Sequence, residues 1–136
     1  VTFPHCCFGG CAIEPDVEGH VLIPNAWTEI HDDAFRNCDT LVSLSIPNNI
    51  SRVGNGSFYG CTRLIAITLP DSTRSIGSSA FSTCTSLNAV LIPNTVTTIG
   101  SWAFESCHSL SAFVLPNNLT SIATSLFQRC TSLTTI

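Results

Sequence analysis

The sequence contains no methionine and no lysine, and only 10% of its 136 residues are charged. Its positive charge comes from five arginines scattered singly, so no basic stripe is available to follow a nucleic-acid backbone. Long apolar runs are also missing, because no aliphatic run exceeds four residues, as in 89–92 before Pro93. A membrane-spanning helix needs about 20 apolar residues, so a span is excluded. We predict neither a nucleic-acid partner nor a membrane span.

The beginning of the sequence lacks the marks of a translation start. No initiator methionine is present, and residues 1–10 have neither the charged nor the apolar zone of a signal peptide. We therefore expect either that a leader has been removed or that the sequence is a fragment.

A repeat of 23 residues organises the rest of the chain. Four columns keep one residue type at this spacing without a shift, and two further columns are apolar. These columns are Pro24, Pro47, Pro70, Pro93 and Pro116; Phe35, Phe58, Phe81, Phe104 and Phe127; Cys38, Cys61, Cys84, Cys107 and Cys130; Leu41, Leu64, Leu87, Leu110 and Leu133; Ile30, Val53, Ile76, Ile99 and Ile122; Leu44, Ile67, Val90, Phe113 and Ile136.

Each unit reads as a short strand, a turn and a helical turn. Alternate apolar residues before the proline predict strands near 21–23, 43–46, 66–69, 89–92 and 112–115. Proline with the following Asn or Asp predicts a turn. Asp32, Asn55, Ser78, Ser101 and Thr124 each precede a phenylalanine by three residues and are predicted N-caps of a single helical turn. Stacked units would bury their apolar columns. The predicted fold is an α/β repeat, a right-handed solenoid with a parallel sheet on one face and short helical turns on the other.

The segment from Ile92 to Leu110 carries a family resemblance. Its pattern Ile-Pro-Asn-x-Val-Thr-x-Ile-Gly-x-x-Ala-Phe-x-x-Cys-x-Ser-Leu resembles the BspA-type leucine-rich repeat, known from bacterial surface adhesins and from protist and algal proteins. The resemblance implies a leucine-rich-repeat solenoid whose surface binds a protein or a cell-surface component, with no catalytic residues. His31 and Ala123 replace the glycine of the pattern, and we expect the fold to tolerate both.

The chain divides into a cysteine-rich flank, 1–20, and about five repeats, 21–136, the last incomplete. Ile136 falls in the middle of an expected strand, so we expect further repeats or a docked partner to cover this end.

The two groups of cysteines are predicted to differ. One cysteine per coil cannot bring four ligands to one zinc ion, so we predict that the repeat cysteines are buried, unbridged and metal-free. Cys6, Cys7 and Cys11 lie outside the repeat, and at least two of them are predicted to take part in a disulfide that staples a cap. A metal site formed by His5 with these thiols, or a segment of free thiols, are the alternatives.

No catalytic motif or cofactor site is recognisable, and we predict a protein that is not an enzyme. The histidines His20, His31 and His108 lie in unrelated columns and are interpreted as surface turn residues. Sequons begin at Asn49, Asn55 and Asn118. Asn49 and Asn118 lie in an exposed turn that could carry a glycan, whereas Asn55 is already assigned to capping.

The outward positions of the strands form an uncharged, partly apolar face that suits contact with another protein. A low-information surface left by repeat duplication is the alternative. We predict a secreted, cell-surface or organelle-lumenal recognition or adhesion module, or else a structural subunit of a larger assembly. The candidate binding residues are Val42, Ile65, Ala66, Thr68, Ala89, Leu91, Ala112 and Val114.

Overall fold

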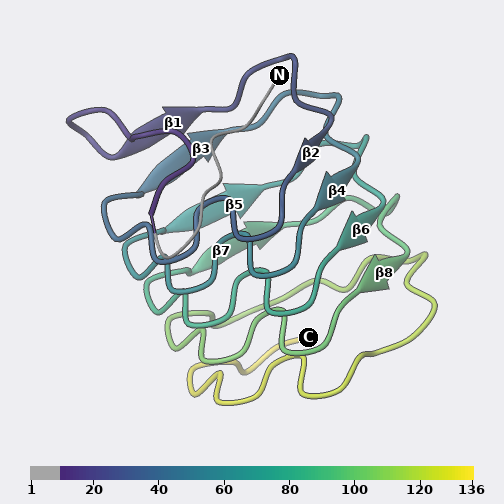
Figure 1. The fold of residues 1–136 in the computed structure, drawn as a ribbon. Helices are drawn as coiled ribbons and strands as arrows, with labels where there is room; N and C mark the ends of the chain where they lie inside the picture. Colours follow the sequence, from purple (N-terminus) through teal and green to yellow (C-terminus); the bar gives the residue numbers. More distant parts are fainter. Residues whose placement is uncertain (1–9) are drawn as a thin grey trace.

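The computed structural model describes residues 10–136, which form a stack of similar coils (Figure 1). We number the coils one to five by the phenylalanine that each contains, from Phe35 to Phe127. Eight short strands follow in chain order: β1 (His20–Leu22), β2 (Glu29–Ile30), β3 (Ser43–Ser45), β4 (Arg52–Val53), β5 (Ala66–Thr68), β6 (Ser75–Ile76), β7 (Ala89–Leu91) and β8 (Thr98–Ile99).

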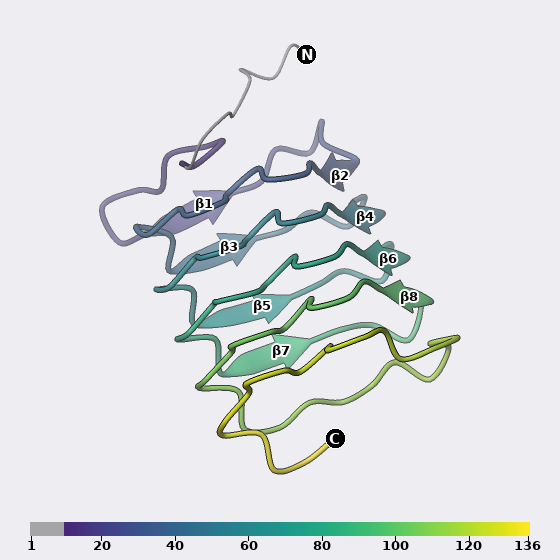
Figure 2. The same ribbon diagram turned by 60° about the horizontal axis from the view of Figure 1, so that its bottom comes forward.

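The strands pair in parallel on two sides of the stack, as Figure 2 shows. Every pair joins residues 23 positions apart, as His20 with Ser43 and Ile76 with Ile99, which confirms the period and the first four predicted strands. The single predicted sheet is wrong in detail. Strands β1–β3 and β5–β7 form two short sheets on one side, and β2–β4–β6–β8 form another on the other. The fifth predicted strand shrinks to one bridge, between Ala112 and Thr135.

The predicted helical turns are also wrong, because residues 10–136 contain no helix. Around Phe35 the amides alternate between two kinds of partner. The amides of Arg36 and Cys38 donate within the coil, whereas those of Phe35 and Asn37 donate to Ser57 and Tyr59 of the next coil. Half of the amides are thus unavailable to a helix, which needs every amide to bond within its own segment.

Two left-handed residues per coil accompany this alternation. They occupy two columns with φ between 54° and 72°, namely Asp33, Gly56, Ser79, Trp102 and Ser125, and Asn37, Gly60, Thr83, Ser106 and Arg129. The predicted N-caps therefore have a different role. Asp32 and Asn55 accept hydrogen bonds from the amides of Asn55 and Ser78, at 2.8 and 2.9 Å, and so join neighbouring coils.

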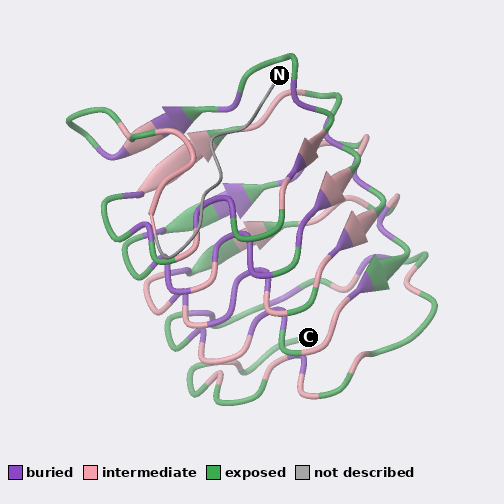
Figure 3. Cartoon of the chain, in the orientation of Figure 1, coloured by how far each residue is buried: buried purple, intermediate pink, exposed green. Residues whose placement is uncertain are grey.

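The core lies between the two sides and runs through the whole stack (Figure 3). Phe35, Phe58, Phe81 and Phe104 are fully buried, and their rings stack almost parallel with centroids 5.1–5.4 Å apart. Burial of such rings is the main source of stability in a fold whose units cannot bury their own apolar sides.

The cysteine column forms a ladder of hydrogen bonds. Cys61, Cys84 and Cys107 are buried free thiols, and each donates to the phenylalanine carbonyl of the preceding coil at 2.9–3.2 Å. Burial raises the pKa of the Cys61 thiol to about 12. The thiols therefore stay protonated and able to donate.

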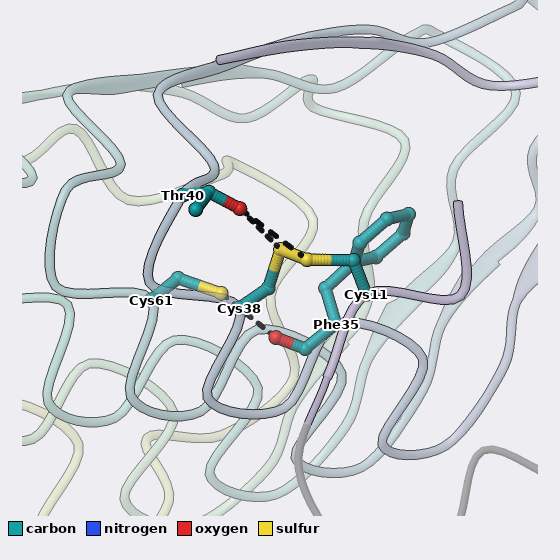
Figure 4. The surroundings of a disulfide bond; sticks show 5 residues. All are labelled: Cys11, Phe35, Cys38, Thr40 and Cys61. Atoms are coloured by element: carbon teal, nitrogen blue, oxygen red, sulfur yellow. Dashed lines mark hydrogen bonds between the residues drawn. A yellow bond between two sulfur atoms is a disulfide. The ribbon is translucent and has the colours of Figure 1, made fainter. Parts of the chain in front are cut away.

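Cys38 departs from the prediction, because it forms a disulfide with Cys11 (Figure 4). In the part of the chain that the structure describes, no phenylalanine carbonyl precedes coil one, and the segment at 10–13 lies beside coil one instead. The amides of Gly10 and Ala12 donate to Arg36 and Ala34, so this segment runs antiparallel to coil one. Cys11 thus takes part in a disulfide, as predicted, but with a repeat cysteine. The prediction that at least two of Cys6, Cys7 and Cys11 do so stays a prediction, because Cys6 and Cys7 lie outside the described residues.

Coil five is less buried than its columns predict. Phe127 and Cys130 are only partly buried, and Ile122 is 61% exposed. Coil five is the last coil of the described residues, so no further coil covers it there, and it also carries Ala123 where coils two to four have a glycine. Gly54 and Gly77 press so closely on the preceding coil that a β-carbon would lie 2.5 Å from the amide nitrogens of Asp32 and Asn55, and Gly100 leaves no more room.

Ala123 therefore has no space at the equivalent place. The amides of Gly54, Gly77 and Gly100 donate to the preceding coil at 2.7–2.9 Å, but within residues 10–136 no such bond joins Ala123 to Ile99. The stack continues through Ala123, as expected, and only this local backbone hydrogen bond is missing.

Candidate functional site

The candidate site is the exposed surface of strands β1, β3, β5 and β7, which we call the outer sheet face. Side chains alternate along each strand, so one residue points into the core while its neighbours point outward. In β5 the buried Ile67 lies between exposed Ala66 and Thr68, and in β7 Val90 lies between exposed Ala89 and Leu91. The 23-residue register then aligns outward residues of successive coils in columns.

Most of the predicted site residues lie on this face. Ile65, Ala66, Thr68, Ala89, Leu91, Ala112 and Val114 are exposed, whereas Val42 is half-buried beside Gly19. Leu91 and Val114 are 65% and 80% exposed, large values for aliphatic side chains in a domain with a well-formed core. The structure thus brings the predicted residues together.

The two halves of the outer sheet face differ in character. The second half, from β5 onward, combines the small side chains of Ala66, Ala89 and Ala112 with the exposed Leu91 and Val114. The first half, on β1 and β3, presents His20, Ser43 and Ser45 beside the exposed Leu22. An apolar half therefore adjoins a half that forms hydrogen bonds.

Sequence reasoning missed His20, interpreting it as a turn residue. It lies in β1, paired with Ser43, and its ring nitrogens Nδ1 and Nε2 lie 2.6 Å from Ser43 Oγ and 2.9 Å from Ser45 Oγ. The missed signal was the position of His20, 23 residues before the outward-facing Ser43.

The turn before β1 positions His20. The Asp16 carboxylate accepts hydrogen bonds from the amides of His20 and Glu18, both at 2.9 Å. The bond from His20, with smaller contributions from Glu18 and from the His20 charge, lowers the pKa of Asp16 despite an opposing desolvation effect. The carboxylate thus contacts the backbone of His20, while both ring nitrogens contact hydroxyls.

This arrangement does not form a hydrolytic triad, which needs a carboxylate to orient the imidazole. Among the described residues there is also no group of three or more side chains arranged to bind a metal ion, and no helix long and apolar enough to cross a membrane.

A group of charged side chains lies on and after β2 and β4, on the other side of the stack. Arg52 approaches Asp32 at 2.6 Å and Glu29 at 3.7 Å, and His31 lies 3.0 Å from Glu29. Desolvation acts to raise the pKa of Asp32, but the Asn55 amide and the Arg52 guanidinium together outweigh it and lower the pKa. These pairs are substantially exposed and tie coils one and two together only weakly.

Comparison with known proteins gives one family. The model of the BspA type leucine-rich repeat region matches residues 2–136 in six copies, so the match includes the flank that the sequence analysis separated from the repeats. None of the curated proteins matches the chain.

Three solved structures are similar to it. A leucine-rich repeat protein of T. pallidum is 36% identical over 85% of this chain, with a TM-score of 0.81. A leucine-rich cell surface protein of Faecalibacterium prausnitzii is 33% identical over 87%, with a TM-score of 0.78, and a leucine-rich repeat protein of Bacteroides ovatus is 34% identical over 85%, with a TM-score of 0.77. The chain spans 56%, 35% and 31% of those three chains.

Proposed function

The chain belongs to the BspA-type leucine-rich repeat family, and from this premise we propose that it is a non-enzymatic recognition module that binds a protein partner through the outer sheet face. Proteins of this family are typically interaction or surface modules. The partner would cover the apolar half of the face and form hydrogen bonds with the first half.

The observation that carries this proposal is the pair of exposed aliphatic side chains on neighbouring coils, Leu91 and Val114, beside the alanine column. Contiguous exposed apolar surface with a polar surround is typical of protein interfaces, and small flat side chains allow close approach. The lack of charge on the apolar half favours a partner surface that is itself uncharged, because burial of an unpaired charge is costly.

We also propose that the chain acts outside the cytosol. The Cys11–Cys38 disulfide is of the kind that persists in oxidising compartments, and the similar Faecalibacterium prausnitzii protein is described as a cell surface protein. Both observations support an exported protein.

A matched pair of variants tests the binding face. Leu91→Glu places a charge in the apolar half of the face. Thr98→Glu places the same charge at an exposed position of β8, on the other side of the stack. Partners cross-linked to the wild-type chain in material from its native source would be identified by mass spectrometry. We expect the partner to be retained by Thr98→Glu and lost by Leu91→Glu.

Equal retention by both variants would show that another surface binds. A partner that co-purifies in fixed stoichiometry with the wild-type chain would favour the structural-subunit alternative.

A further inference from the structure

The three sequons differ in how the structure uses their asparagine side chains. An N-linked glycan is attached to the side-chain nitrogen Nδ2 and leaves one N–H and the carbonyl Oδ1 in place. The folded chain accommodates a glycan most easily where Nδ2 is exposed and bonded to nothing. We propose that Asn55 is an N-glycan attachment site.

Asn49 fits a glycan poorly. Its Nδ2 donates to the carbonyls of Asn25 and Trp27, at 2.7 and 2.9 Å, so both N–H groups hold the preceding coil. A glycan on Asn49 would remove one of these bonds. Asn118 donates from Nδ2 to one carbonyl, that of Asn94 at 2.7 Å, and would retain that bond only if the glycan replaced the other hydrogen.

Asn55 has the opposite geometry. Its Oδ1 accepts the amide of Ser78 at 2.9 Å, and because an amide N–H must face an oxygen, this bond fixes which way the side chain points. Nδ2 then lies on the other side, and it donates no hydrogen bond within residues 10–136. The residue is exposed and has Gly54 and Gly56 as its chain neighbours, so no adjacent side chain crowds the amide. The sequence-based argument that capping already occupies Asn55 is wrong for Nδ2, since only Oδ1 is used.

Ser57 supplies an independent observation. It is fully buried and its hydroxyl has no hydrogen-bond partner, although three of the four equivalent residues, Ala34, Ala80 and Ala103, are alanine. A buried unpaired hydroxyl destabilises a fold, so the folded structure gives no reason for serine here. The sequon does give one. Asn55-Gly56-Ser57 requires a hydroxyl at its third position, and it is recognised before the chain folds.

The modification would use a lipid-linked oligosaccharide and a transferase of a secretory pathway. The Asn55 Nδ2 forms a bond to C1 of the first sugar and loses one proton. The bond between C1 and the phosphate oxygen breaks, and the lipid pyrophosphate leaves. No oxidation or reduction takes place. The inference depends on the proposed export of the chain but not on the outer sheet face.

The test uses the full 136-residue chain, secreted from eukaryotic cells behind an added signal peptide. Peptide mass spectrometry, before and after treatment with an amidase that removes N-glycans and converts the asparagine to aspartate, would report each sequon separately. We expect a glycan on Asn55, retained in Ser57→Thr and absent in Ser57→Ala and Asn55→Gln. Asn49→Gln is the matched control and should keep the glycan on Asn55. The same peptide from the native source should carry the glycan.

Ser57→Ala provides a second measurement that does not depend on the transferase. Removal of the unpaired hydroxyl should raise the urea midpoint of the unglycosylated chain. A lowered midpoint would show that Ser57 stabilises the fold, and the buried serine would then no longer support a glycan on Asn55. Secreted chain with the Cys11–Cys38 disulfide but an unmodified Asn55, or with a glycan on Asn49 alone, would overturn the proposal and leave the binding face untouched. Native protein that lacks the disulfide would instead contradict export itself.

Discussion

Coils four and five have almost the same sequence pattern and yet pack differently. In coil four Ile99 is buried in β8 and the Gly100 amide donates to Ile76, whereas in coil five Ile122 is exposed and β8 has no further neighbour strand in the described residues. The difference at the contact is one β-carbon, on Ala123 instead of Gly100. The missing backbone hydrogen bond at residue 123 is what this methyl group accounts for, whereas the exposure of coil five also reflects that no coil follows it in the described residues.

The largest expected loss of stability distinguishes the phenylalanine stack of coils one to four from Phe127 of coil five. Phe81→Ala removes a fully buried ring that stacks on Phe58 and Phe104, and we expect a loss of about 3 to 5 kcal/mol in the free energy of unfolding. Phe127 is only partly buried, so Phe127→Ala should cost about 1 to 2 kcal/mol. Urea denaturation of both variants measures the difference. Two equally mild variants would contradict a shared core.

The next effect tests the steric cause directly. Gly100→Ala should lower the free energy of unfolding by about 2 kcal/mol, because the added β-carbon would meet the backbone of Ser78 and push the coils apart. Replacement of glycine by alanine otherwise tends to stabilise a protein by restricting the unfolded chain. A loss therefore points to the contact. Hydrogen exchange should show faster exchange of the residue 100 amide, and a neutral effect with unchanged exchange would contradict the explanation.

The reverse substitution should bring coil five into line with coil four. Ala123→Gly removes the obstructing methyl group, so Ile122 can be buried and the amide of residue 123 can donate to Ile99. Burial of an isoleucine contributes about 1.5 to 3 kcal/mol, and the flexibility of glycine offsets about 0.5 to 1 kcal/mol. Because the substitution would order only part of coil five, we expect the free energy of unfolding to rise by at most about 1 kcal/mol. Protection of the residue 123 amide is the specific readout, and continued rapid exchange there would refute the prediction.

Features that depend on the 23-residue period were predicted correctly from the sequence. Features that depend on contacts between atoms of different coils were not. The strands around Leu44, Ile67 and Val90 were predicted almost to the residue, because a 23-residue repeat fixes a 23-residue register. The prediction of helical turns failed because one unit does not show where its amides bond, and the partners of the Phe35 and Asn37 amides lie 22 residues away in the next coil.

The candidate site shows the same division. Leu91 and Val114 follow from strand alternation and were placed correctly. The contact of His20 with two serine hydroxyls depends on side chains of neighbouring coils, and the Cys11–Cys38 disulfide depends on the path of a segment outside the repeat. Neither is encoded in the repeat pattern.

The smallest expected effect concerns the polar column in which Asp32 and Asn55 join neighbouring coils. Asn55 shows that an amide oxygen is sufficient for this hydrogen bond, so Asp32→Asn should keep the bond to the Asn55 amide and lose only an exposed ion pair with Arg52. We expect a change below about 0.5 kcal/mol, against about 1 kcal/mol for Asp32→Ala, which leaves the Asn55 amide without that acceptor.

The dependence on pH distinguishes the two contributions. The pKa of Asp32 is lowered from its ordinary value of 3.8, so its carboxylate stabilises the folded state fully above that value, and this stabilisation is lost as the pH falls through the lower folded-state pKa. Asparagine does not titrate. Between pH 7 and about pH 2, the free energy of unfolding should therefore fall further for the wild-type chain than for Asp32→Asn. Urea melts of both proteins at the two pH values measure this difference. A difference between the two proteins that is independent of pH would show that the charge of Asp32 contributes nothing and that residue 32 acts through its hydrogen bond to the Asn55 amide alone.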